Sequence, residues 1–100
     1  MIKVTVLYGH PTDSSAFESY YGTTHMPLVG RIKGLAKAEV TKFLPNADGS
    51  DPEYYRMAEL WFDTPAAMQE ALGSPEGKAT TDDLGNFATG GVKMLVGMVG

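Results

Sequence analysis

One histidine stands in a segment, residues 20–28 (YYGTTHMPL), whose spacing could hold an imidazole in an apolar groove. Phe17, Tyr21, Leu28 and Ile32 recur around His25 at helical intervals, so all five side chains are predicted to share the inward face of a helix. An ionisable ring on a buried face needs a hydrogen-bond partner or a chemical role. Because imidazole exchanges protons near neutral pH, His25 is the candidate general acid or base. Tyr21, one turn earlier, is the second candidate catalytic residue.

The groove beside His25 is expected to lie between this helix and a sheet. An apolar pocket with one imidazole and one or two phenols suits a small hydrophobic or aromatic ligand. The residues expected to bind that ligand are Phe17, Tyr8, Leu28, Phe62 and Phe87.

The alternative interpretation is that His25 is a structural core residue. Its ring would then be tied to a backbone carbonyl or to Asp83. The carbonyl of Thr23, which Pro27 cannot engage, is one such acceptor. Asp83 and Asn86 are interpreted as caps or loop anchors rather than as reacting groups.

Composition excludes several classes of chemistry. The chain has no cysteine, so disulfides, thiolate catalysis and cysteine metal sites are absent. Its only other histidine, His10, has no metal-binding spacing to His25, and Gly90-Gly91 precedes a strand rather than a helix. We therefore expect neither a metal nor a nucleotide cofactor. The chain also lacks the nucleophile elbow that is typical of many serine hydrolases.

The charge pattern and the N-terminal segment bear on partners and location. A net charge of −4 spread along the chain argues against a nucleic-acid partner. No apolar run approaches the length of a membrane span, and the alternating first residues do not resemble a signal peptide. With the lack of cysteine, this predicts a cytoplasmic protein without a membrane partner.

The elements that would position these residues follow from periodicity and turn signals. Alternating β-branched residues predict a strand over 2–8, and further strands are expected over 36–44, 54–62 and 92–99. A helix capped by Thr12 or Asp13 is expected to run to about Lys33, with a kink at Pro27 and a stop at Gly34. Two more helical stretches are expected over 65–72 and from the Ser74 turn to about residue 86. The order predicts one α+β domain over 1–100, a ferredoxin-like βαββαβ fold with a four-stranded antiparallel sheet.

The second face of this sheet is expected to be unusually apolar. The strand positions that do not face the helices include large side chains, which would be exposed in a monomer: Leu7, Phe43, Met57, Trp61, Leu95 and Val99. Packing this face against a second copy would bury them, with Thr5, Glu59 and Lys93 pairing within the interface. The chain is therefore predicted to form a homodimer through the sheet face.

Several motifs resemble those of the EthD family, named for a protein of ethyl tert-butyl ether degradation. The first is Phe17-x-x-Tyr20-Tyr21-x-x-x-His25-x-Pro27-Leu28, and further matches follow over 58–63, 74–77 and 82–87. The resemblance covers essentially the whole chain in order. It implies a dimeric α/β-barrel, in which two ferredoxin-like sheets face each other with the helices outside.

The resemblance does not imply one reaction, because the wider superfamily includes cofactor-independent monooxygenases, lactone isomerases, haem-handling enzymes and aldoxime dehydratases. One hypothesis is a cofactor-free oxidoreductase of monooxygenase type, an isomerase or a lyase, acting on a hydrophobic metabolite of a catabolic or secondary-metabolic pathway. Another is a non-catalytic binding or accessory protein with the same pocket. A third is a dimer in which a buried His25 is purely structural.

Overall fold

Four antiparallel strands form the sheet in the computed structural model, which describes residues 1–100. They are β1 (Ile2–Tyr8), β2 (Leu35–Lys42), β3 (Arg56–Phe62) and β4 (Val92–Met98). Their order across the sheet is β2-β3-β1-β4, so β1 and β3 are central and β2 and β4 are the edges. The predicted ferredoxin-like α+β fold is confirmed, and the strand boundaries lie within two residues of those expected.

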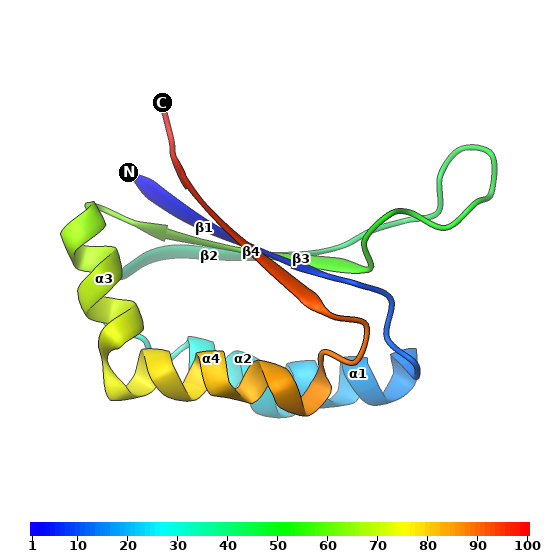
Figure 1. The fold of residues 1–100 in the computed structure, drawn as a ribbon, viewed down its shortest axis with the longest axis horizontal. Helices are drawn as coiled ribbons and strands as arrows, with labels where there is room; N and C mark the ends of the chain where they lie inside the picture. The colour runs from blue at the N-terminus through cyan, green and yellow to red at the C-terminus, as the bar shows by residue number, and fades with distance from the viewer.

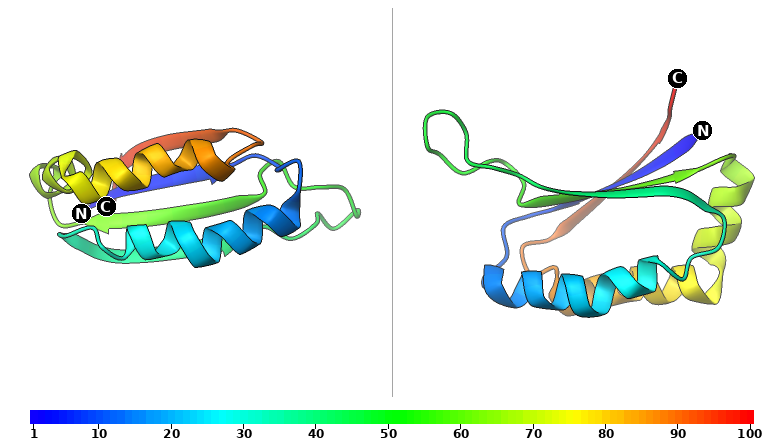
Figure 2. Two further views of the ribbon diagram at one scale, coloured as in Figure 1. Left: turned by 90° about the horizontal axis from the view of Figure 1, so that it is seen from below. Right: turned by 180° about the vertical axis from the view of Figure 1, so that it is seen from behind.

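All helical segments lie on one face of this sheet (Figures 1 and 2). The first connection contains α1 (Ser14–Tyr20), a π-helical turn η1 (Tyr21–His25) and α2 (Met26–Val29). The second contains α3 (Pro65–Gly73) and α4 (Pro75–Phe87). The α1-η1-α2 segment and α4 lie side by side under the sheet, and the loop between β2 and β3 projects away from the body (Figure 2). None of the helices is long and apolar enough to cross a bilayer.

Local signals place the start of each helix. The side chains of Asp13, Thr64 and Ser74 each accept a hydrogen bond from a backbone N–H three residues later, which satisfies one of the free donors of the first turn. Pro65 and Pro75 follow two of these caps, where a missing N–H removes no helical hydrogen bond.

The first helix differs from the expectation in two ways. Residues 21–25 widen into a π turn, in which the Met26 N–H donates to the carbonyl of Tyr21, five residues earlier. Pro27 then begins a new α-helical turn instead of kinking a continuous helix. The helix also ends at Val29 rather than near Lys33, because the next N–H groups turn back three residues, from Arg31 to Leu28 and from Ile32 to Val29.

The core fills the space between the sheet and the helical layer. Alternate residues of β1 and β3 point toward the helices and are buried, including Val4, Tyr8 and Phe62, which are almost completely enclosed. Phe17 and Phe87 pack edge-on at 5.2 Å between ring centroids and join this cluster from α1 and α4. The aromatic cluster holds the two helical segments at a fixed position over the centre of the sheet.

The opposite face of the sheet carries no helix (Figure 1). Leu7, Met57 and Trp61 are half-buried there rather than exposed, since neighbouring side chains such as Lys37, with Nζ 4.7 Å from the Trp61 ring centroid, cover part of their surface. The more exposed apolar groups lie on β4 and just after it, where Leu95 and Val99 are 49% and 45% exposed. The predicted barrel of two copies stays a prediction at this point.

Candidate functional site

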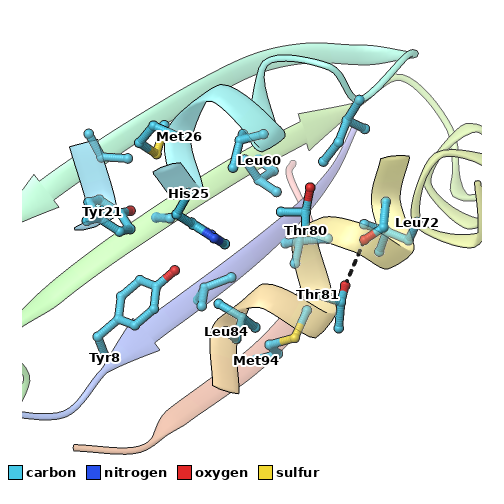
Figure 3. Close-up of a pocket in the computed structure, with 17 residues that line it drawn as sticks. Tyr8, Tyr21, His25, Met26, Leu60, Leu72, Thr80, Thr81, Leu84 and Met94 are labelled. Carbon is cyan, nitrogen blue, oxygen red and sulfur yellow. Dashed lines mark hydrogen bonds between the residues drawn. The ribbon is translucent and has the colours of Figure 1, made fainter. Parts of the chain in front are cut away.

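An apolar cavity lies between the sheet and the helical layer, beside His25 (Figure 3). Its empty volume is about 510 Å³, which includes the open space at its mouth. Thirteen of its 17 lining residues are hydrophobic, and no lysine, arginine, aspartate or glutamate lines it. The lining is drawn from both layers: Val4, Val6, Tyr8, Tyr21, His25, Met26, Val29, Ile32, Val40, Ala58, Leu60, Leu72, Gly77, Thr80, Thr81, Leu84 and Met94. Such a cavity favours a neutral, mainly hydrophobic ligand.

His25 is the one ionisable imidazole in the cavity wall, and it is held by a carboxylate. Its Nδ1 lies 2.9 Å from Oδ2 of Asp83, and both side chains are buried. An ionised carboxylate can only accept, so Nδ1 carries the proton and Nε2 is the nitrogen with a lone pair in the neutral ring. The ring of His25 projects into the cavity (Figure 3), and Asp83 does not line it. Nε2 is therefore the nitrogen available to a ligand.

Asp83 is fixed by donors on its other oxygen. Its Oδ1 accepts from the Tyr20 hydroxyl at 2.5 Å and from the side-chain amide of Asn86 at 2.9 Å. Burial alone would raise the pKa of Asp83, but the hydrogen bonds from Tyr20, Asn86 and His25, with the charge of the imidazole, outweigh it and lower that pKa. The carboxylate therefore stays ionised beside His25.

Two phenols flank the imidazole on the same side of the cavity (Figure 3). Tyr21 stacks on His25 with 5.7 Å between ring centroids, and Tyr8 meets Tyr21 edge-on at 5.5 Å. Burial raises the pKa of both tyrosines, so both hydroxyls are protonated at neutral pH and can donate. The Tyr21 hydroxyl is buried and makes no hydrogen bond of good geometry within the protein, although the Tyr8 hydroxyl is near enough to influence its pKa. An unpaired donor of this kind is suited to an oxygen atom of a ligand.

A charged pair supports Tyr21 from outside the cavity. The guanidinium carbon of Arg56 lies 5.1 Å from the Tyr21 ring centroid, and its nitrogens bind both carboxylate oxygens of Glu18 at 3.1 and 2.7 Å. Hydrogen bonding from Arg56 is the main cause of the lowered pKa of Glu18. This bidentate pair fixes the position of Arg56 beside Tyr21.

The structure brings together only some of the residues expected to contact a ligand. Tyr8, Tyr21 and His25 line the cavity. Phe17, Phe62 and Phe87 are buried in the core but do not line the cavity.

The expectation that Leu28 faces the groove is wrong, because it is half-buried and lies outside the lining. Met26, Val29 and Ile32 line the cavity from this segment instead. The π turn holds more residues than an α-helical turn, so the inward stripe runs 17, 21, 25, 29, 32 rather than through position 28.

The partners of His25 were only partly accessible from sequence. From the sequence, Asp83 is expected to bind His25 only if His25 is a structural core residue. Tyr20 and Asn86 are not expected to be part of the site. A signal was present in the second half of the chain, where Thr80, Asp83 and Phe87 recur at helical spacing and are all buried. An aspartate inside such a stripe needs a buried donor, and His25 is the histidine that can reach it.

Distant solved structures share the fold alone. SnoaB, described as a cofactor-independent oxygenase from Streptomyces nogalater, is 15% identical with a TM-score of 0.66, over 98% of this chain and 90% of that one. Two proteins of unknown function described as dimeric, from Bacteroides fragilis and Thermobifida fusca, are each 14% identical with TM-scores of 0.70 and 0.74. They cover 98% of this chain and 95% and 90% of their own.

Relatives with higher sequence identity show to which family the chain belongs. An uncharacterised 11.0 kDa protein of Rhodococcus erythropolis, from the thcB-thcC intergenic region, is 40% identical over 95% of this chain and 91% of its own length. The crystal structure of an ethyl tert-butyl ether degradation (EthD) family protein from Bacillus halodurans is 33% identical with a TM-score of 0.92, covering 99% of this chain and 98% of that one. The EthD domain model matches residues 9–91. The chain therefore belongs to the EthD family.

Proposed function

We propose that this protein binds a small, neutral, hydrophobic molecule in the inner cavity and that His25 moves a proton on it without a cofactor. The observation that carries the proposal is the buried pair of His25 and Asp83, with the free Nε2 facing an otherwise apolar cavity. A carboxylate on Nδ1 fixes the tautomer and holds the ring at one angle, so that the unprotonated Nε2 can act as a general base.

The most direct use of this arrangement is proton removal next to a carbonyl group. Nε2 would take a proton from the carbon beside the carbonyl, which leaves an enolate on the substrate and an imidazolium on His25. Asp83 would stabilise that imidazolium, and the hydroxyl of Tyr21 or Tyr8 would donate to the enolate oxygen. Return of the proton to a different atom completes an isomerisation with all atoms conserved. Proton removal from carbon is also a step open to lyases and to oxygenases that use no cofactor, so the base serves all three reaction classes.

The test uses 2-tetralone, a neutral bicyclic ketone with acidic hydrogens beside its carbonyl, as the probe. In D₂O, the wild-type protein is expected to accelerate the exchange of these hydrogens for deuterium, measured by proton NMR, while His25→Gln returns the rate to the background. The matched control is His10→Gln, since His10 binds the carbonyl of Pro52 and does not line the cavity.

The same experiment tests the alternative of a non-catalytic binding protein, which uses the same cavity. Saturable binding of 2-tetralone without accelerated exchange in the wild type would support a carrier or sensor. Exchange that survives in His25→Gln would exclude His25 as the base.

We also propose that the protein is a homodimer joined through the sheet face opposite the helices. The two distant structures described as dimeric support this assembly by analogy of fold. The exposed apolar side chains of β4 lie on both faces of that strand, since Val92, Met94, Val96 and Met98 on the helix side are at least 41% exposed. The interface is therefore expected to include the β4 edge as well as the outer sheet face.

A further inference from the structure

The carboxylate of Asp83 divides its two oxygens between different partners. Oδ2 faces His25, whereas Oδ1 accepts from Tyr20 and Asn86. Neither Tyr20 nor Asn86 lines the inner cavity, so neither can touch a molecule bound there. Their hydrogen bonds reach the site through Asp83, while the Tyr20 ring also packs on Phe87, whose ring lies 4.6 Å from that of His25.

The two donors come from different elements that meet outside the cavity. Tyr20 is the last residue of α1, directly before the π turn that carries His25, and Asn86 lies three residues after Asp83 in α4. The Tyr20 ring stacks on Phe87 with 5.4 Å between centroids, which fixes the direction of its hydroxyl. The hydrogen bonds therefore join the two helical segments at the level of His25.

A second groove, which shares no lining residue with the inner cavity, is also lined by these two donors. Tyr20 and Asn86 line it with Thr12, Asp13 and Thr89, and its empty volume is about 430 Å³, open space included. The hydrogen-bonded chain from Tyr20 through Asp83 to His25 thus links this groove to the inner cavity. Tyr20 and Asn86 are therefore accessible from this groove.

We propose that Tyr20 and Asn86 are positioning residues, which hold the Asp83 carboxylate so that His25 keeps its proton on Nδ1 and presents the lone pair of Nε2 to the cavity. This inference rests on the proposed function, because it concerns the same base. Without the two donors, the carboxylate could rotate and protonate more easily, and the imidazole would lose its fixed acceptor.

The titratable groups that face Asp83 are few. Tyr20 and His25 contact it from the first helical segment, and the more distant Tyr8 of β1 also senses its charge. Among the hydrogen bonds that lower the pKa of Asp83, that from the Tyr20 hydroxyl has the largest effect, followed by those from Asn86 and His25, and the charge of His25 adds to them. Removing that hydroxyl is therefore expected to raise the pKa of Asp83.

The experiment measures the chemical state of His25 directly and needs no substrate. The chain has two histidines, so ¹⁵N NMR of the imidazoles resolves both, and His10 serves as an internal reference. In the wild type, the neutral ring of His25 is expected to carry its proton on Nδ1. Diethyl pyrocarbonate, a small uncharged reagent that acylates unprotonated imidazole nitrogen, then reports the availability of Nε2 by mass spectrometry.

Tyr20→Phe keeps the ring that stacks on Phe87 and removes only the hydroxyl. We expect it to lower the acylation rate of His25 about tenfold, the equivalent of one hydrogen bond to a charged group, and to leave His10 unchanged. The carboxyl ¹³C signal of Asp83 should also titrate at a higher pH than in the wild type. The matched control is Tyr54→Phe, which removes a hydroxyl without a hydrogen-bond partner in the protein. If Tyr20→Phe does not fold, Asn86→Ala provides the same test.

The outcomes separate this inference from the proposed function. If Asp83→Asn alters the tautomer and the acylation rate of His25 but both Tyr20→Phe and Asn86→Ala match the wild type, the positioning role is overturned and the base remains. If Asp83→Asn also matches the wild type, the pair itself has no influence on Nε2 and the proposed function fails with it.

Discussion

His25 and Asp83 are separated by 58 positions in the chain, and their side chains meet at 2.9 Å in the interior. The inward position of His25 could be predicted from residue types at helical spacing. Its partner could not be assigned, because the pairing depends on how α4 packs against η1, and no local pattern encodes the contact between two helical segments. Sequence reasoning therefore located the imidazole and left open whether its ring was paired with a carboxylate or a carbonyl.

The pair predicts a specific dependence of stability on pH. The pKa of Asp83 is lowered on folding, so its contribution to stability is fully present above its ordinary value of 3.8 and is lost as the pH falls through the lower folded value. Asp83→Asn removes the titrating group. The free energy of unfolding of this variant should therefore fall less steeply at acidic pH than that of the wild type. Urea unfolding of both proteins between neutral and strongly acidic pH measures the difference. Glu18→Gln tests another carboxyl with a lowered pKa on its own. Parallel curves for the wild type and Asp83→Asn would contradict the lowered pKa.

Two buried hydroxyls without partners provide a second residue-level test. Tyr21 and Tyr55 both bury an unpaired hydroxyl, but only Tyr21 lines the cavity. Changing either to phenylalanine should raise the free energy of unfolding by up to about 1 kcal/mol, because a buried donor without a well-aligned acceptor is removed. Only Tyr21→Phe should weaken the binding of 2-tetralone, measured by NMR titration. Equal affinity in the two variants would mean that the Tyr21 hydroxyl does not contact the ligand.

At the scale of elements, the π turn explains why the order of helices and strands could be predicted better than the residues that face the cavity. The alternation in β1 and the caps at Asp13, Thr64 and Ser74 are local signals, and the elements follow them closely. The widening of residues 21–25 has no such signal, although Pro27 indicated an irregular helix. One irregular turn was enough to replace Leu28 with Val29 on the inward face.

The packing of α3 against α4 depends on a glycine. A Cβ on Gly77 would lie 2.2 Å from the carbonyl oxygen of Ala71 and 2.7 Å from the Cα of Leu72, so the helices could not keep their separation. Because these neighbours are backbone atoms, Gly77→Ala should destabilise the fold by about 3 kcal/mol or more and displace the part of α4 that lines the cavity. Gly85→Ala, in the same helix with open space around the new methyl, should instead stabilise by up to about 1 kcal/mol. Thermal unfolding should show a lower melting temperature for Gly77→Ala and a higher one for Gly85→Ala than for the wild type. A change in the same direction in both variants would contradict this packing.

At the scale of the whole molecule, the two layers separate the site from the predicted interface. The helices cover one face of the sheet and enclose the cavity, while the other face and β4 remain open (Figure 1). In a homodimer built on the open face, each copy would therefore keep its own His25 and its own cavity. Only Met94, which lies on the β4 edge and lines the cavity at 42% exposure, would bring the interface close to the ligand.

This arrangement predicts how a charge on the open face would act. Leu95 lies opposite Thr5 on the outer side of β4 and is 49% exposed, so Leu95→Glu adds little strain to a single copy but would bury a carboxylate in the dimer. Light scattering after size-exclusion chromatography should give twice the chain mass of 10.7 kDa for the wild type and the single-chain mass for this variant. Ala66→Glu adds the same charge to an exposed position of α3 and should stay dimeric. A wild type that elutes as a single chain would refute the dimer, and a Leu95→Glu variant that stays dimeric would place the interface away from the sheet face. Since His25 and Asp83 lie on the other side of the sheet, the proton exchange catalysed by Leu95→Glu is expected to fall only as far as the monomer loses stability.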